Sequence, residues 1–247
     1  MNKPKIIVFD LETINLKADL SPILCFGWKI HGEGGARCIG IWDYPVKERP
    51  FDDRRLCREI AKIMSEADAV VAHFGRGFDW PFLKSRLLYN RAGFLPPLRV
   101  LDTWKIAKDN LLITSNRLKS VAKFLRLKQQ KGDSGGWDTW LNVVNGNKRA
   151  IAKMARYCKQ DVRCLDAVFT ALRPFIKDMP SWSALNNRAV CPSCGSQSCQ
   201  RRGREITRTR VRTRWNCRGC GSWFYFNKDQ LPIKSTLANS PPRSKRR

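Results

Sequence analysis

The sequence predicts an α/β fold with a mixed five-stranded sheet, flanking helices and a small, β-rich second unit. Three apolar runs come first, and two further short apolar runs then alternate with stretches of helical periodicity. Consecutive strands followed by alternating helices and strands are typical of a mixed α/β sheet. With 247 residues, 43% of them hydrophobic, the chain can bury one main core and leave room for a small second domain.

The predicted strands are short apolar runs bounded by turn residues. The first three are residues 6–9, 23–30 and 36–42, and the Gly-rich segment 31–35 between the last two predicts a hairpin. Two compact runs, 69–72 and 98–101, complete the five strands.

The predicted helices carry apolar residues at helical spacing. Between Asp53 and Glu66 these are Leu56, Ile60, Ile63 and Met64. Similar patterns predict helices at residues 82–89, 104–109, 117–125 and 148–172, the last of which ends before Pro174. The polar, Gly-containing segment 128–146 predicts a long loop that Trp137 and Trp140 pin to the body of the domain.

The chain is strongly basic, with 47 Lys and Arg against 21 acids and a net charge of +26. Such a charge attracts polyanions, of which nucleic acid is the commonest. The opening residues lack a signal peptide's apolar core, and no stretch is long enough to span a bilayer. We therefore expect a soluble, intracellular (cytoplasmic) protein whose ten cysteines are metal-bound or free thiols.

Two acids at the end of the first strand organise the rest of the chain. Asp10 and Glu12 share one side of an extended segment, while Phe9 and Leu11 point into the packing. Paired carboxylates repel each other unless a cation lies between them. The alternative is a solvent-facing strand end with two ordinary acids.

Two further acids, Asp79 and Asp161, would be ordinary by themselves. Asp79 stands at the mouth of a predicted helix, where the helix dipole favours negative charge. Asp161 lies on the long predicted helix, four residues after Tyr157, so the two share a face.

Three segments together resemble the three motifs of the DEDD 3′-to-5′ exonucleases, a family with the ribonuclease H-like fold. They are Asp-Leu-Glu-Thr at 10–13, His-Phe-Gly-Arg-Gly-Phe-Asp-Trp-Pro-Phe-Leu at 73–83 and Tyr-Cys-Lys-Gln-Asp-Val at 157–162. Tyr157 makes the chain similar to the tyrosine subclass (DEDDy), because the histidine subclass would carry His where Arg156 stands. The resemblance covers residues 5 to about 175.

This resemblance implies a metal-dependent exonuclease that hydrolyses phosphodiester bonds at 3′ ends by a two-metal-ion mechanism. Two divalent ions, Mg²⁺ or Mn²⁺, would be held by Asp10, Glu12, Asp79 and Asp161, and Tyr157 would orient or help deprotonate the attacking water. The substrate would be nucleic acid, with single strands or 3′ ends expected. The sequence leaves DNA and RNA equally open.

One residue departs from the family pattern. The second motif often carries Asn after the position of His73, and this chain has Phe74, which cannot hold substrate by hydrogen bonds. We expect Phe74 to pack in the core, with stacking on a base as the alternative. Asp102, at another strand end, is expected to cap the following helix, with a place at the site as the alternative.

Two Cys-x-x-Cys-Gly knuckles follow, with 22 residues between them. Four thiolates at this spacing suit one tetrahedral Zn²⁺ in a zinc ribbon, held by Cys191, Cys194, Cys217 and Cys220. Cys199 is expected to be a free thiol, with a substituted zinc ligand as the alternative. Cys25, Cys38, Cys57, Cys158 and Cys164 lie in apolar patterns and are expected in the core.

A series of arginines lies between the knuckles. The alternation of Arg with Thr and Val predicts one strand with its last four arginines on a single face, suited to phosphate contacts. The alternative is a solvated edge strand that its charge protects from aggregation. The candidate nucleic-acid contacts are Arg201, Arg202, Arg204, Arg208, Arg210, Arg212 and Arg214.

The resulting domain organisation has four parts. We expect an exonuclease domain at 1–177, a linker at 178–188, a nucleic-acid-binding zinc ribbon at 189–231 and a basic, disordered tail at 232–247. One alternative is a catalytically weak nuclease-fold protein that only binds nucleic acid. Another is an interaction protein whose ribbon recruits it to replication or repair proteins.

Overall fold

The computed structural model describes residues 3–46, 49, 51–129, 136–176, 179–186 and 189–225. These residues form two compact units, one within 4–172 and the other within 173–225 together with Lys3. The predicted tail at 232–247 lies outside the described residues, as do parts of the predicted linker and the side chain of Trp137. Among the helices that are described, none has the length and apolar character needed to cross a bilayer.

The larger unit is built on a mixed sheet of five strands in the order β3-β2-β1-β4-β5. The first three strands pair antiparallel, and β4 and β5 continue the sheet in parallel with β1. The predicted mixed five-stranded sheet is therefore confirmed. Its strands are β1 (Ile6–Thr13), β2 (Ile23–Ile30), β3 (Arg37–Gly40), β4 (Ala69–Ala72) and β5 (Arg99–Asp102).

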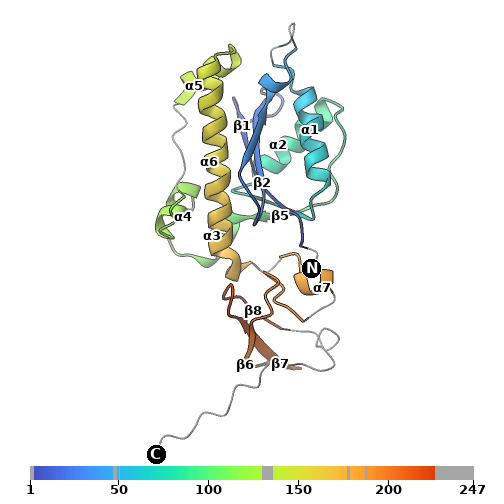
Figure 1. The fold of residues 1–247 in the computed structure, drawn as a ribbon, viewed down its shortest axis with the longest axis vertical. Coiled ribbons are helices and arrows are strands. Elements are labelled where there is room, and N and C mark those ends of the chain that lie inside the picture. Colours follow the sequence, from blue (N-terminus) through green and yellow to red (C-terminus); the bar gives the residue numbers. More distant parts are fainter. Residues whose placement is uncertain are drawn as a thin grey trace, which may run out of the picture. The chain divides into compact units, whose positions relative to one another are not determined.

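Helices flank this sheet on both faces (Figure 1). The long helix α6 packs on the antiparallel strands, and α3, α4 and α5 pack against α6. From the other side α1 packs on β2 and on α2. The elements are η1 (Ile41–Asp43), α1 (Arg54–Ser65), α2 (Asp79–Tyr89), α3 (Thr103–Asn110), α4 (Leu118–Phe124), α5 (Gly136–Val144) and α6 (Lys148–Leu172).

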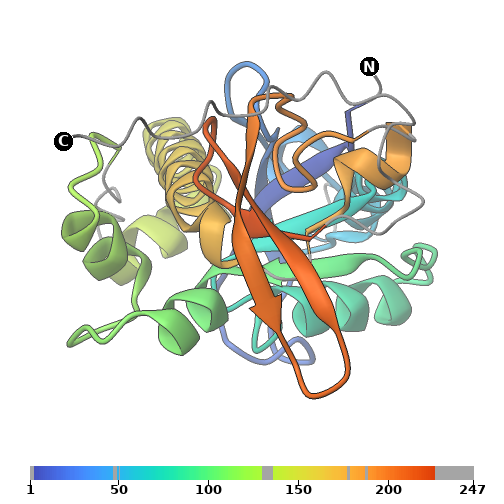
Figure 2. The same cartoon turned by 90° about the horizontal axis from the view of Figure 1, so that it is seen from below.

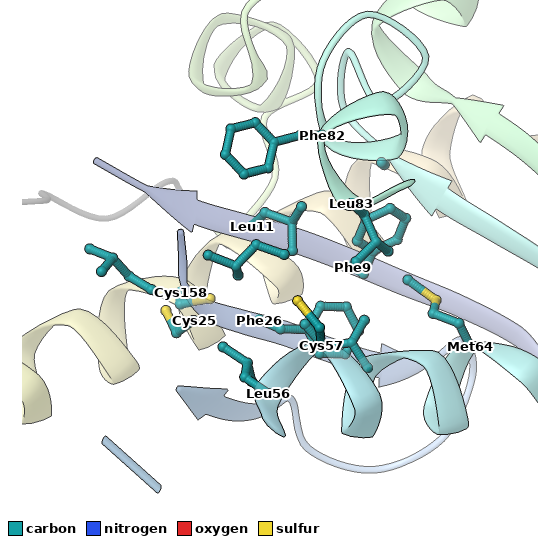
Figure 3. Packing of buried hydrophobic residues seen from close by; sticks show 14 of the residues in the cluster. Phe9, Leu11, Cys25, Phe26, Leu56, Cys57, Met64, Phe82, Leu83 and Cys158 are labelled. Atoms are coloured by element: carbon teal, nitrogen blue, oxygen red, sulfur yellow. The ribbon is translucent and has the colours of Figure 1, made fainter. Parts of the chain in front are cut away.

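The core explains why the acids of β1 face α6. Phe9 and Leu11 are buried among side chains of α1 and α2, including Leu56 and Leu83 (Figure 3). Burying a side chain of this size contributes about 1.5–3 kcal/mol. Because side chains alternate along a strand, the burial of Phe9 and Leu11 on one face directs Asp10 and Glu12 to the opposite face of the sheet.

The loop predicted at residues 128–146 is wrong. Instead of a loop throughout 128–146, the structure contains helix α5, which packs against α6. Trp140 on α5 is held to the end of β1, since its Nε1 donates a hydrogen bond to the carbonyl of Thr13 (3.1 Å). The predicted pinning by Trp140 is thus confirmed, but it anchors a helix.

The smaller unit contains a three-stranded antiparallel sheet in the order β6-β7-β8. Figure 2 shows β6 and β7, in orange and red, as a long twisted hairpin. A short helix, α7, lies inside the segment predicted as a linker. The elements are η2 (Arg173–Phe175), α7 (Trp182–Asn186), β6 (Cys199–Ile206), β7 (Val211–Cys217) and β8 (Trp223–Phe224).

Candidate active site

Three carboxylates meet on the sheet face that α6 covers. One oxygen from each of Asp10, Glu12 and Asp161 lies within 4.8 Å of the other two. Glu12 is 8% exposed and Asp161 only 1%. Buried carboxylates this close repel each other, and bringing a cation between them removes that repulsion. A set of oxygen donors of this kind suits a hard divalent cation such as Mg²⁺ or Mn²⁺.

The fourth predicted acid, Asp79, is joined to this cluster through the backbone. It is the first residue of α2 and is 4% exposed. Its Oδ1 accepts a hydrogen bond from the amide of Leu11 (3.2 Å), the residue between Asp10 and Glu12. The structure therefore brings the three predicted motifs to one place in the fold.

Gly27 determines how closely α6 approaches the sheet. It pairs with Asp10 across β1 and β2. A Cβ atom at Gly27 would lie 2.5 Å from Sγ of Cys158 and 3.0 Å from a methyl group of Val162. The absence of a side chain therefore lets the helix that carries Asp161 lie directly on the strand beside the acids. Sequence reasoning missed this residue, because the helix it contacts is distant along the chain.

Tyr157 lies one helical turn before Asp161 on α6 and is 9% exposed. The ring of Trp140 meets it edge-on, with 6.5 Å between the ring centroids. The hydrogen bond from Trp140 to Thr13 fixes that indole against the end of β1. Trp140 thus restricts the position of the Tyr157 ring, a contact that the sequence analysis did not predict. The only signal was a tryptophan in a polar segment.

Phe74 does not pack in the core, and that expectation is wrong. Its side chain is 45% exposed, and its backbone has a φ of 62°, a value that is rare for a bulky residue. The ring lies edge-on to Trp104 with the centroids 5.1 Å apart. The ring also packs against Gly77, where a Cβ atom would lie 2.4 Å from the nearest ring carbon of Phe74. The second motif therefore presents an exposed aromatic ring.

Asp102 holds this backbone in place. Its carboxylate accepts hydrogen bonds from the amides of Phe74 (2.9 Å) and Arg76 (3.0 Å), and from Trp104 (3.0 Å) at the start of α3. The predicted cap of α3 is confirmed. The same side chain also fixes the left-handed turn at Phe74, so its role here is structural.

Comparisons with known proteins decide the family. The family model described as the RNase_H superfamily matches residues 7–173, which is most of the chain. The chain belongs to the RNase H superfamily. The predicted ribonuclease H-like fold is thereby confirmed, with the acids described above on its first strand, second helix and long helix α6.

This RNase H superfamily member also resembles a solved structure, the family B DNA polymerase from the hyperthermophilic archaeon Pyrobaculum calidifontis. The TM-score is 0.54 at 15% sequence identity, and the match covers 84% of this chain and 31% of the polymerase. At this identity the likeness shows the fold. The chain spans about a third of the polymerase's length. No curated protein matches the chain.

Outside the part that matches the RNase H superfamily, four cysteines converge in the small unit. Their Sγ atoms all lie within 4.8 Å of one another, and the pairs Cys191–Cys220 and Cys194–Cys217 are each 3.7 Å apart. Tetrahedral Zn²⁺ with Zn–S bonds of about 2.3 Å requires sulfur atoms about 3.8 Å apart. The four predicted ligands therefore fit one zinc ion.

The two knuckles share one backbone geometry. Gly195 and Gly221 have φ angles of 73° and 77°, which allow the chain to turn back after each cysteine pair. Their amides donate to the carbonyls of Cys191 and Cys217, each at 2.9 Å. Hydrogen bonds from the neighbouring thiols of Cys191 and Cys194 lower the pKa of Cys220. Cys199 is buried against this group but is not one of the four.

The predicted strand of four arginines is wrong in its extent. Strand β7 begins at Val211, so Arg208 and Arg210 lie in the turn between β6 and β7. Two hydrogen bonds with Arg210 close that turn: the amide of Thr207 donates to the carbonyl of Arg210, and the hydroxyl of Thr207 accepts from the amide of Arg210.

The pairing of β6 with β7 places arginines on both faces of the hairpin. Arg201 lies opposite Trp215 and Arg204 lies opposite Thr213, on one face. Arg212 lies opposite Glu205, on the other face. All seven candidate arginines are nevertheless exposed.

Proposed function

We propose that this protein is a metal-dependent 3′-to-5′ exonuclease of the tyrosine subclass. One observation carries the proposal: one oxygen from each of Asp10, Glu12 and Asp161 lies within 4.8 Å of the other two. In addition, Asp79 accepts a hydrogen bond from the backbone amide of Leu11, which lies between the two acids of β1. Crowding three acids, two of them buried, without a cation is costly, so their arrangement is best explained by cation binding.

The four acids would hold two divalent ions. When bound, such ions stabilise the attacking and leaving oxygens of an in-line phosphoryl displacement. Tyr157, on α6, would orient or help deprotonate the attacking water, and the contact with Trp140 restricts the orientation of its ring. The hydrogen bond between Asp79 and Leu11 fixes the acid of α2 relative to those of β1 before substrate arrives.

The substrate is proposed to be a single-stranded 3′ end. The net charge of +26 favours a polyanion, and the exposed ring of Phe74, which lies edge-on to the half-buried ring of Trp104, offers a surface on which an unpaired base can stack. Lys108 lies over the Trp104 ring at 4.8 Å, which adds a cation to this surface. A base inside a duplex would not present its face in this way.

Digestion of 5′-labelled single-stranded DNA and RNA with Mg²⁺ or Mn²⁺ tests the proposal. We expect a ladder that shortens stepwise from the 3′ end and is abolished by EDTA. Asp161→Asn should remove it, whereas Asp109→Asn, at an exposed acid paired with Lys105, should digest normally. A 5′-to-3′ ladder, internal cuts or full activity of Asp161→Asn would contradict the proposal. Metal-independent binding without cleavage would favour the binding-protein alternative.

We further propose that the small unit is a zinc ribbon that binds nucleic acid. The sulfur geometry supports zinc, and the seven exposed arginines support phosphate contacts. Replacing Arg201, Arg202 and Arg204 with Gln should weaken single-strand binding. The slope of log K against log salt concentration should also become shallower by about 0.7 for each phosphate contact that is lost. The matched control is Gln at the exposed residues Arg54, Arg55 and Arg58 of α1. Equal salt slopes in the two variants would contradict the assignment.

A further inference from the structure

A second group of sulfur atoms lies inside the larger unit. Sγ of Cys25 on β2, Cys38 on β3 and Cys158 on α6 are all within 4.8 Å of one another. In the antiparallel register Cys25 faces Gly40 and Cys38 faces Gly27, so both thiols lie on the α6 side of the sheet. The missing side chain of Gly27 provides the space that Cys158 occupies. Figure 3 shows Cys25 and Cys158 together at the edge of the core.

The three thiols differ in access and acidity. Cys25 and Cys158 are fully buried, whereas Cys38, on the edge strand β3, is partly exposed. Hydrogen bonds from Cys158 and Cys25 lower the pKa of Cys38 to about 5 against the opposing effect of burial. Hydrogen bonds to the other two thiols raise the pKa of Cys158. Cys38, the partly exposed residue of the three, is thus also the one whose pKa is lowered, as in thiols that react with oxidants.

The number of ligands disfavours a structural metal ion at this place. Structural zinc sites take four protein ligands, and among the described residues this group gathers three sulfur atoms. A disulfide between two of the thiols needs no further ligand.

We propose that Cys38 is a peroxide-reactive thiol that Cys158 resolves into a disulfide between β3 and α6. The Cys38 thiolate attacks one oxygen of hydrogen peroxide, the O–O bond breaks, and the other oxygen leaves as water after taking up a proton. The resulting sulfenic acid is attacked by the sulfur of Cys158, the S–O bond breaks, and a second water leaves. Two thiols are oxidised to one disulfide while one peroxide is reduced to two waters.

Formation of this bond also acts on the catalytic helix. A disulfide requires its sulfur atoms to be about 2.05 Å apart, closer than two separate thiols can lie. Cys158 follows Tyr157 directly and lies three residues before Asp161. The bond therefore draws this part of α6 toward the sheet edge. We expect the oxidised protein to lose nuclease activity and to regain it with a thiol reductant, a result that rests on the proposed function.

Mass spectrometry tests the modification without relying on activity. The zinc-saturated full chain is treated with a small excess of hydrogen peroxide, alkylated and digested under non-reducing conditions. We expect a cross-linked peptide pair containing Cys38 and Cys158, a loss of 2 Da, and two fewer alkylated thiols. Cys38→Ser should abolish the cross-link, Cys158→Ala should leave sulfenic or sulfinic acid at Cys38, and Cys164→Ala on the same helix should change nothing.

Three results would overturn the proposal. One is a Cys38 thiol that stays reduced until the chain unfolds, and another is a cross-link that joins Cys38 to Cys25. The third is a bound zinc content of two per chain that falls to one in Cys158→Ala, since it would make the three thiols a metal site. If peroxide forms the disulfide but the reduced protein cleaves no nucleic acid, the proposed function fails and the modification stands.

Discussion

Asp79 accepts a hydrogen bond from the backbone amide of Leu11, with 3.2 Å between nitrogen and Oδ1. Leu11 is buried in the core, and the residues on either side of it carry the two acids of β1. The first turn of α2 is thereby fixed to the strand at the point where the carboxylates converge. Asp79 thus combines a structural contact with a charge, and substitutions can separate the two.

Asp79→Asn keeps an oxygen that can accept from Leu11 but removes the charge. We expect it to unfold at nearly the native urea concentration and to lose more than about 100-fold in activity, beyond the effect typical of residues that only support a metal ligand. Asp79→Ala should lose activity equally and also about 1 kcal/mol of stability, because the amide loses its partner. Single-turnover rates and urea unfolding of both variants check this. An active Asp79→Asn enzyme would exclude a role for the charge.

Gly27→Ala should push α6 away from the sheet. The added methyl group would overlap Cys158 and Val162, and overpacking of a core commonly costs about 1–3 kcal/mol. Because α6 carries Tyr157 and Asp161, activity should fall together with stability. Gly34→Ala is the control, since a Cβ at that turn glycine has nothing within 4 Å. Equal activity and unfolding free energy in the two variants would show that the close approach is unimportant.

Phe74→Gly should separate substrate stacking from stability. Gly adopts the left-handed backbone more readily than Phe, which offsets the lost contact with Trp104, so we expect the unfolding free energy to change by less than about 1 kcal/mol. KM for single strands should rise several-fold while kcat changes little. Phe94→Ala, at a ring that is 85% exposed, is the control. An unchanged KM in Phe74→Gly would remove the aromatic surface from the site.

Asp166 should contribute to acid sensitivity. Burial raises its pKa, but hydrogen bonds from His31 (2.6 Å) and Lys29 outweigh that effect, and the net pKa lies below the ordinary value of 3.8. A carboxylate with a lowered pKa stabilises the fold above its unfolded pKa of about 3.9, and this stability is lost as the pH falls through the lower folded value.

Urea unfolding between about pH 6 and pH 3 measures this contribution. The native chain should lose stability more steeply below about pH 4 than Asp166→Asn does. Asp109→Asn, which changes an exposed acid, should keep the native slope. Parallel pH profiles for the native chain and Asp166→Asn would contradict the assignment.

Much of the larger unit could be predicted from local patterns. Helix α6 was predicted with its observed bounds, because its apolar period runs unbroken and Pro174 follows its end. Strand β4 was predicted equally well from four buried apolar residues. The acids of the site were found through motif resemblance, since Asp79 and Asp161 lie far apart in sequence and have no local signature.

Features that depend on tertiary packing were missed. Helix α5 is stabilised by contact with α6, and its polar, Gly-containing surroundings predicted a loop. The turn after β6 contains no Gly or Pro and is closed by the side chain of Thr207. Because the alternation of Arg with Thr continues through this turn, it was predicted as part of one strand. Phe74 was expected in the core, because hydrophobicity alone does not reveal a left-handed backbone fixed by Asp102.

Whether the four acids hold divalent ions against the scissile phosphate is tested most directly with a sulfur-substituted substrate. Single strands are prepared whose 3′-terminal phosphodiester carries sulfur at one non-bridging oxygen, as separated diastereomers. Mg²⁺ prefers oxygen, whereas Mn²⁺ tolerates sulfur better. We predict that one diastereomer resists cleavage with Mg²⁺ and is cleaved with Mn²⁺, while the unmodified strand is cleaved with both. Cleavage of both diastereomers at the unmodified rate in Mg²⁺ would contradict metal contact at the scissile bond.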